Sequence, residues 1–154
     1  VKAKLPTGQG LWPAIWLLFS NDTYGGWAAS GEIDIMEHVG YDPDSIHTTV
    51  HTGAFNHTKG TQKGESTYLS DSEDAFHLYA IEWFPESIDF FVDEEKVFTF
   101  KNRGGDSEEW PFDKPFHLIL NVAVGGNWGG KHGVDNTIFP ATMEVDYVRV
   151  YKQR

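Results

Sequence analysis

The sequence contains no cysteine, which excludes disulfide bonds and metal sites built on thiolates. It also has few basic residues, because 12 Lys and Arg against 23 Asp and Glu give a formal net charge of −11. This balance argues against nucleic acid or an anionic membrane as a partner, since both require a basic surface. A neutral ligand remains compatible with it.

Long apolar runs are missing as well. The longest, LWPAIWLLF, is interrupted by Pro13 and is shorter than the roughly 18 apolar residues of a transmembrane helix. We therefore expect no membrane span. The composition is that of a folded protein, with 40% hydrophobic and 15% aromatic residues, and 154 residues suffice for one domain with its own core.

Helical periodicity is scarce along the chain. Short alternating or apolar runs are instead separated by Gly, Pro, Asn and Asp, which predicts an all-β sandwich or barrel. The predicted strands lie near residues 1–5, 13–19, 31–38, 46–52, 76–84, 87–93, 96–100, 116–124 and 142–152. Long loops are predicted at 53–74, 101–113 and 125–137. Without a repeat or a linker, residues 1–154 are interpreted as a single domain.

The segment GEIDIME, residues 31–37, carries three acids among β-branched or apolar residues. On a regular strand Glu32 and Asp34 share one face, whereas Glu37, five residues after Glu32, falls on the other. A β-bulge at Ile35–Met36 adds one residue and returns Glu37 to the face of the other two acids. We therefore predict a bulged strand with three carboxyl groups on one face.

Crowded carboxylates repel one another, so at least one of the three must have a raised pKa. This allows a protonated acid to stand beside an ionised carboxylate near neutral pH, as acid–base catalysis requires. Side chains of Glu32 and Glu37 leaning together would bring their carboxyl groups to about 5–6 Å, near the separation used by retaining glycosidases. The alternative is an acidic, solvent-facing strand. Repulsion between adjacent like charges and the nearby aromatic residues weaken that alternative.

Several tryptophans stand in or beside polar and Gly-rich loops, where a flat indole can stack on the apolar face of a pyranose ring. We predict that four of them contact a ligand: Trp12, Trp27, Trp110 and Trp128. Trp16 in PAIWLLF and Trp83 in YAIEWF lie within apolar runs and are predicted to be core residues.

Six stretches together resemble glycoside hydrolase family 16, and within it the laminarinases, which are endo-β-1,3-glucanases. They are GLWPAIWLL, GEIDIME, TTVH, FHLYAIEW, WPFDKPFHLILNVAVGGNWGG and FPATMEVDYVRVY. The stretches follow the order of the family along nearly the whole chain. The resemblance implies a β-jelly-roll sandwich of two antiparallel sheets, with a concave sheet that forms a glycan-binding cleft.

The resemblance also implies roles for individual residues. Glu32 matches the nucleophile, Asp34 the assisting carboxylate and Glu37 the general acid/base. His51 resembles the cleft histidine of laminarinases, and Asn121, which interrupts the apolar run HLILNVAV, matches a position that faces sugar.

The implied activity is endo-acting, retaining hydrolysis of β-1,3-glucan through a covalent glycosyl-enzyme intermediate. Two alternatives stay open. The same fold and mechanism could act on mixed-linkage β-glucan or a marine galactan, or the chain could be a non-catalytic glycan-binding relative. The resemblance implies a secreted protein without a catalytic cofactor, but with a structural calcium that has Asp146 among its ligands.

The catalytic domain of the family normally begins well before VKAKLP, with several strands that complete both sheets. The resemblance therefore implies that residues 1–154 correspond to the C-terminal part of one such domain. The remaining strands would belong to a longer chain or to a separate one. We expect a monomer unless another chain supplies them.

Overall fold

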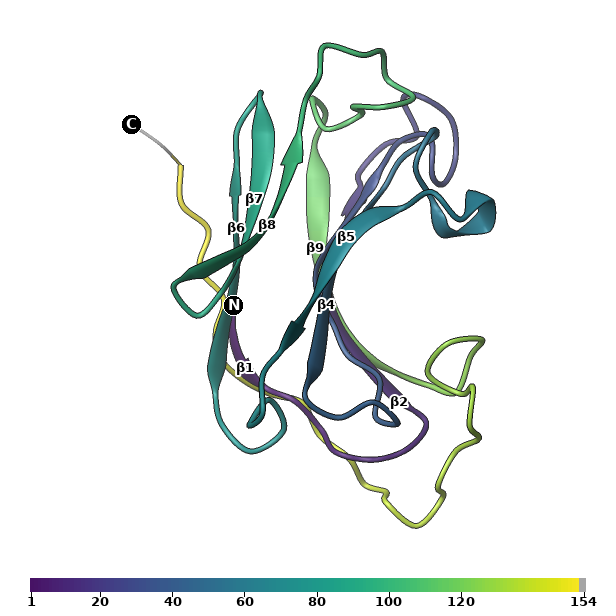
Figure 1. The fold of residues 1–154 in the computed structure, drawn as a ribbon, viewed down its shortest axis with the longest axis vertical. Helices are drawn as coiled ribbons and strands as arrows, with labels where there is room; N and C mark the ends of the chain where they lie inside the picture. The colour runs from purple at the N-terminus through teal and green to yellow at the C-terminus, as the bar shows by residue number, and fades with distance from the viewer. Residues whose placement is uncertain (153–154) are drawn as a thin grey trace.

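The computed structural model describes residues 1–152 as two β-sheets in two layers (Figure 1). The first sheet has the order β10-β1-β6-β7-β8 and contains β1 (Lys2–Lys4), β6 (His77–Trp83), β7 (Ser87–Val92), β8 (Glu95–Lys101) and β10 (Glu144–Tyr147). The second has the order β5-β4-β3-β2-β9 and contains β2 (Leu11–Phe19), β3 (Glu32–Glu37), β4 (Ser45–His51), β5 (Lys63–Tyr68) and β9 (Phe116–Val124). All pairings between these strands are antiparallel, which confirms the predicted all-β sandwich.

A short 3₁₀ helix, η1 (His57–Lys59), is the one helical element among residues 1–152. No helix in this part of the chain has the length and apolar character needed to cross a bilayer.

Two predicted boundaries are wrong. Strand β5 lies inside the predicted loop 53–74, because its sequence KGESTY is almost wholly exposed and shows no apolar alternation. It is an edge strand held by backbone pairing with β4 alone. At the other end, the strand predicted at 142–152 is only four residues long. It pairs with β1, and the last residue pair is Lys2 with Tyr147.

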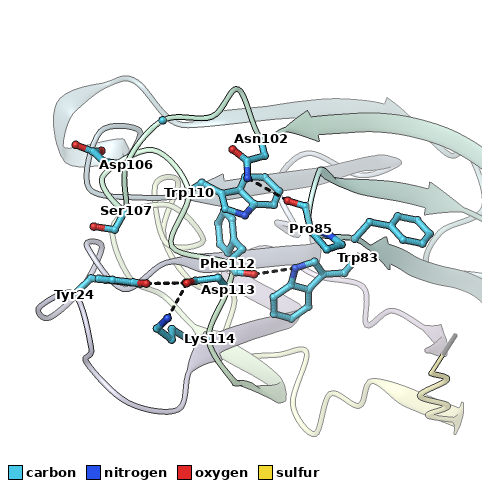
Figure 2. A pocket seen from close by; sticks show the side chains of 12 residues that line it. Tyr24, Trp83, Pro85, Asn102, Asp106, Ser107, Trp110, Phe112, Asp113 and Lys114 are labelled. Carbon is cyan, nitrogen blue, oxygen red and sulfur yellow. Dashed lines mark hydrogen bonds and ion pairs between the residues drawn. The ribbon is translucent and has the colours of Figure 1, made fainter.

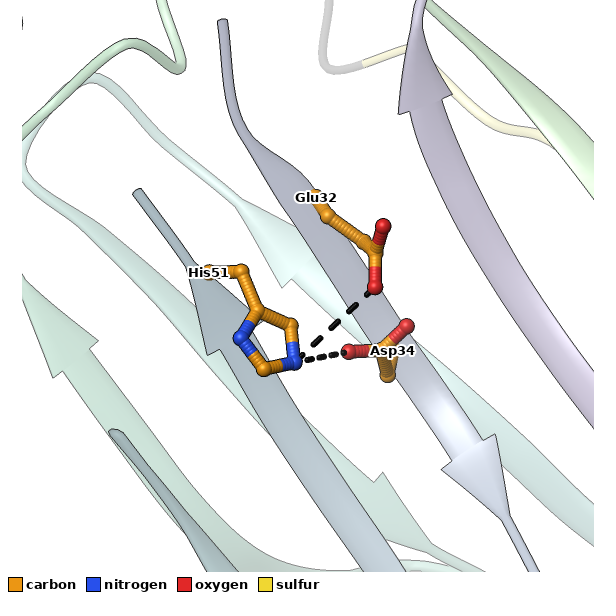
Figure 3. A group of neighbouring side chains, drawn as sticks. All are labelled: Glu32, Asp34 and His51. Atoms are coloured by element: carbon orange, nitrogen blue, oxygen red, sulfur yellow. Dashed lines mark ion pairs between the residues drawn. The ribbon is translucent and has the colours of Figure 1, made fainter. Parts of the chain in front are cut away.

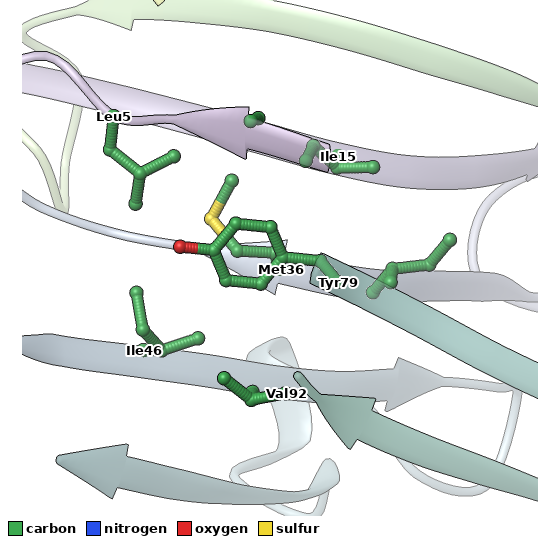
Figure 4. Packing of buried hydrophobic residues seen from close by; sticks show 8 residues of the cluster. Leu5, Ile15, Met36, Ile46, Tyr79 and Val92 are labelled. Carbon is green, nitrogen blue, oxygen red and sulfur yellow. The ribbon is translucent and has the colours of Figure 1, made fainter. Parts of the chain in front are cut away.

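The core lies between the two sheets (Figure 4). Ile15, Met36 and Ile46 of the second sheet pack against Tyr79 and Val92 of the first, and all five are buried. A second buried cluster continues the core and contains Ile33, Val50, Ile88, Phe90, Phe100, Trp110 and Phe112. The second sheet thus has one face against the core and the opposite face free to carry polar side chains.

The second sheet curves away from the first sheet (Figure 1). The segment around η1 and the loop that follows β9 project from opposite ends of this sheet, on the side away from the first one. The central strand on that outer face is β3, which carries the three acids.

Candidate active site

Strand β3 contains the predicted bulge. On the side of β2, Met36 pairs with Ile15 and Asp34 pairs with the next residue, Trp16. Ile35 therefore has no partner residue on β2. On the other side, the pairing with β4 shifts between Asp34 and Glu37. Ile35 and Met36 are consecutive yet both buried in the same core cluster, which a regular strand does not allow. The extra residue returns Glu37 to the outer face.

A cavity of about 210 Å³ lies over the centre of this face. Its lining residues are Trp12, Ala14, Trp16, Glu32, Asp34, Glu37, Asn121 and Ala123. The three acids therefore face a common space, together with the predicted Trp12 and Asn121. The prediction that Trp16 is a core residue is wrong, because its indole Nε1 donates a hydrogen bond of 2.8 Å to Asn121 Oδ1 within this cavity. Alternation along β2 places Trp12, Ala14 and Trp16 on one face, and this signal was available in the sequence.

Glu32 begins β3 directly after Gly31, which has a φ of +90°. A Cβ at Gly31 would lie 2.8 Å from Pro111 Cγ and 2.9 Å from Phe112 Cε1, so only glycine fits at this turn. The Glu32 carboxylate accepts a 2.7 Å hydrogen bond from Trp27 Nε1. Trp27 therefore holds an acid in place and, being 40% exposed, also presents its ring to solvent.

Glu37 accepts a hydrogen bond of 3.1 Å from Trp12 Nε1. Trp128 packs edge-on against Trp12 with ring centroids 5.3 Å apart, and against His47 at 4.9 Å. The Gly-rich loop after β9 thus brings Trp128 beside the residue that holds Glu37. This arrangement places the predicted Trp12 and Trp128 at the same end of the cavity.

Burial raises the pKa values of all three acids, and charge repulsion adds to the effect at Asp34 and Glu37. Burial raises the pKa of Glu37 to about 7, with the Glu32 charge adding to it and the Trp12 hydrogen bond opposing it. Burial and then the charges of Glu37 and Glu32 hold the pKa of Asp34 well above its usual range. Burial also raises the pKa of Glu32, but hydrogen bonds from Trp27 and Asp34 favour its ionised form. Near neutral pH this favours protonated Asp34 and Glu37 beside an ionised Glu32.

His51 lies opposite Glu32 on the neighbouring strand β4. Its Nε2 is 3.4 Å from Asp34 Oδ2 and 3.9 Å from Glu32 Oε1 (Figure 3). Burial lowers the pKa of His51 to about 4, so its imidazole is neutral at pH 7. The rings of Trp27 and His57 cover it, with centroids 5.7 and 5.3 Å away. His57 was not predicted, because η1 lies within the predicted long loop 53–74.

Residues 1–149 match the sequence profile described as "Glycosyl hydrolases family 16". The chain belongs to this family. The resemblance seen in the motifs is thereby confirmed.

Relatives of this family 16 chain are similar to it over nearly its whole length. It is 54% identical over 159 residues to the "Beta-glucanase" of Rhodothermus marinus, a match that covers 99% of the chain and 56% of that protein. It is 42% identical over 154 residues to the "Keratan-sulfate endo-1,4-beta-galactosidase" of Sphingobacterium multivorum, covering 99% of the chain and 36% of the relative. The crystal structure of SCLam, described as a non-specific endo-β-1,3(4)-glucanase, superposes with a TM-score of 0.94 at 51% identity, covering 100% of the chain and 57% of SCLam. The chain thus spans little more than half the length of the β-glucanase and of SCLam.

Trp110 does not line the acid cavity in this family 16 chain, and its contact with a ligand stays a prediction. It is only 8% exposed and stacks on Phe100 with ring centroids 5.5 Å apart. It also lines a larger cavity of about 700 Å³, which shares no lining residue with the acid cavity (Figure 2). There the polar groups of Trp83 and Tyr24 are bonded to Phe112 and Asp113. Although larger, this cavity has no crowded set of carboxyl groups with raised pKa values.

Asp146, the predicted calcium ligand, lies on β10 in the first sheet. Its Oδ2 is 3.3 Å from Lys2 Nζ, so its neighbour is a cation rather than a further oxygen ligand. Calcium requires about six to eight oxygens. Among residues 1–152, the grouped ligand side chains are Glu32, Asp34 and His51, without Asp146. A calcium ion at Asp146 therefore stays a prediction.

Proposed function

We propose that this chain carries the catalytic face of a retaining endo-β-1,3-glucanase. One observation supports this above all: three carboxyl groups face one cavity on a bulged strand, in environments that favour different protonation states. A binding protein gains nothing from such crowding, whereas a glycosidase needs a carboxylate and a carboxylic acid together. The names of the β-glucanase relative and of SCLam agree with a glucan substrate.

In the first step, a carboxylate oxygen of Glu32 attacks the anomeric carbon of the bound sugar. The bond between that carbon and the leaving oxygen breaks, and Glu37 transfers its proton to this oxygen. The products are a glycosyl ester on Glu32 and a released chain with a free hydroxyl group. Asp34 keeps its proton and donates a hydrogen bond to Glu32, which orients the attacking carboxylate.

In the second step, water cleaves the ester. Once Glu32 is esterified it carries no charge, so one cause of the raised Glu37 pKa disappears and Glu37 is stabilised as a carboxylate. Glu37 then takes a proton from water while the water oxygen attacks the anomeric carbon. Glu32 is released as a carboxylate, and the sugar keeps its original anomeric configuration.

Incubation with laminarin, lichenan and agarose tests this proposal. The release of reducing ends measures hydrolysis of each substrate. We expect activity on laminarin, with the first-formed anomer retained in proton NMR spectra. An inverted first product would contradict the role of Glu32 as nucleophile. Binding of laminarin without release of reducing ends would instead favour the non-catalytic alternative.

A mixed-linkage glucan is the second candidate substrate, since SCLam is described as a non-specific endo-β-1,3(4)-glucanase. Higher activity on lichenan than on laminarin would favour it. The galactan alternative has support from the name of the keratan-sulfate endo-1,4-β-galactosidase relative, and agarose hydrolysis tests it.

Hydrolysis should decline as the pH rises above about 7, because Glu37 then loses the proton that it must donate. Trp12→Phe removes the hydrogen bond that favours the Glu37 carboxylate, so this decline should move to higher pH. The measurement is kcat/KM against pH, which reports the ionisations of the free enzyme. An unmoved alkaline limb in Trp12→Phe would show that another group controls it.

Trp128→Ala should weaken binding of laminarin oligosaccharides by about 1–3 kcal/mol, the range found where aromatic rings stack on flat ligands. Calorimetric titration measures this loss. Tyr68→Ala, which removes an aromatic residue 75% exposed on the edge strand β5, is the matched control and should bind normally. Unchanged affinity with a lower melting temperature in Trp128→Ala would assign this residue a packing role.

We also propose an extracellular location for this activity, because a polysaccharide substrate does not cross a membrane unaided. The monomeric state stays a prediction, which size-exclusion chromatography with light scattering would test.

A further inference from the structure

Glu32, Asp34 and His51 direct three different ligand atoms at one point on the outer face of the second sheet (Figure 3). These atoms all lie within 4.8 Å of one another. Two of the side chains come from β3 and one from β4, and both strands lie in the interior of the sheet. The backbone pairing of Glu32 with His51 fixes their separation.

Two buried atoms of this group have no hydrogen-bond partner. Asp34 is 2% exposed, and its Oδ2, the oxygen that faces His51, accepts no hydrogen bond that meets normal geometry. The Nδ1 atom of His51 is also unpartnered, but it lies on the other side of the ring from the two acids, which face Nε2. Buried polar atoms nearly always have a partner, and an unsatisfied one calls for an explanation such as a bound ion. An ion between Asp34 and His51 would satisfy the carboxylate oxygen.

The donor set identifies the class of ion. Magnesium and calcium prefer oxygen ligands, whereas zinc accepts imidazole nitrogen and carboxylate oxygen together. Zinc binds these atoms tetrahedrally at about 2.0–2.2 Å, which places neighbouring ligand atoms about 3.3–3.6 Å apart. The 3.4 Å between His51 Nε2 and Asp34 Oδ2 meets this requirement, and the 3.9 Å to Glu32 Oε1 needs only a small side-chain movement.

We propose that Glu32, Asp34 and His51 form a zinc-binding site with three protein ligands and a fourth position open to the acid cavity. A neutral imidazole offers a ring-nitrogen lone pair to a metal, and Nε2 is the nitrogen of His51 that faces Asp34 and Glu32. A dication would also offset the repulsion among the crowded carboxylates, which otherwise oppose one another's ionisation. Binding would displace any proton that Asp34 carries.

Zinc at this position would inhibit the enzyme. A Glu32 oxygen that ligates zinc cannot attack an anomeric carbon, and the ion would occupy space beside the sugar. This consequence rests on the proposed hydrolysis, whereas zinc binding itself does not.

Calorimetric titration of the metal-free chain with ZnCl₂ at pH 7 tests the site. We expect one tight equivalent per chain, and no comparable binding of MgCl₂. His51→Ala should weaken zinc binding by at least about tenfold, since loss of even an outer partner of a zinc ligand costs about 10–100-fold. His57→Ala is the matched control, because its ring lies 5.3 Å from that of His51 yet it contributes no atom to the ligand group. It should bind zinc as the parent does.

Asp34→Asn is a second variant that preserves side-chain shape, and it should show the same loss if His51→Ala fails to fold. Unchanged zinc affinity in folded His51→Ala or Asp34→Asn, absence of zinc binding to the parent, or equal binding of magnesium would each overturn the proposal. If the parent hydrolyses laminarin, zinc should inhibit it with the midpoint found by calorimetry. If the parent is inactive, calorimetry alone decides the zinc site.

Discussion

Glu32→Gln should abolish laminarin hydrolysis and leave oligosaccharide binding largely intact. The amide retains the shape of the side chain but has no carboxylate oxygen to attack the anomeric carbon. Removing an enzymatic nucleophile lowers kcat by a factor on the order of 10⁴ or more. Reducing-end release measures the loss, and calorimetry with laminarin oligosaccharides measures binding.

The matched control is Glu94→Gln, which makes the same chemical change at an exposed position in the turn between β7 and β8. It should hydrolyse laminarin at the parent rate. Should Glu32→Gln keep even about a tenth of the parent activity, far above the loss expected for a nucleophile, Glu32 would not be the attacking group.

Glu37→Gln should lower laminarin hydrolysis by about 10²–10⁴-fold, the usual contribution of a general acid or base. An aryl β-glucoside oligosaccharide with an acidic phenol as its leaving group needs no proton in the first step. On that substrate the glycosyl ester should form at a near-parent rate and then accumulate, because no base activates water. Rapid release of the phenol followed by slow turnover would show this.

Azide distinguishes the role of Glu37 from that of Glu32, because azide is a nucleophile that needs no general base. In Glu37→Gln it should attack the glycosyl ester, release the Glu32 carboxylate and give a β-glycosyl azide of retained configuration. An α-glycosyl azide formed by Glu37→Gln would contradict the assignment, since azide would then have replaced the nucleophile.

Most strands could be predicted from the sequence, because a strand that buries one face shows alternating apolar residues. Ile33 and Val50 belong to such strands, and both are in the core. The polar strand β5 could not be predicted, because backbone pairing with β4 rather than side-chain burial holds it in place. Its exposed sequence is indistinguishable from that of a loop.

The shared face of the three acids could be predicted, because regular alternation would place Glu37 on the opposite face and a single β-bulge corrects this. The five-residue offset of Glu37 from Glu32 requires a bulge if they share a face, and the pairing shifts in β3 confirm it. The packing of Trp110 could not be predicted, because its polar surroundings in the sequence do not reveal that its ring stacks on Phe100. Loop tryptophans are thus less predictable than strand residues, since tertiary contacts alone decide where their rings point.

The bulge also anchors the acid-bearing strand to the core. Ile35 and Met36 fix β3 to the core at two consecutive residues, and β3 is the middle strand of its sheet. Exposing the amides of β3 to solvent should require opening that approaches global unfolding, so they should be among the slowest to exchange with deuterium. Trp27 and Trp128 instead lie outside the strands, so their backbone amides should exchange faster than those of β3. Core packing therefore sets the positions of the acids on β3, whereas side-chain contacts of the loops set the positions of the two indole rings.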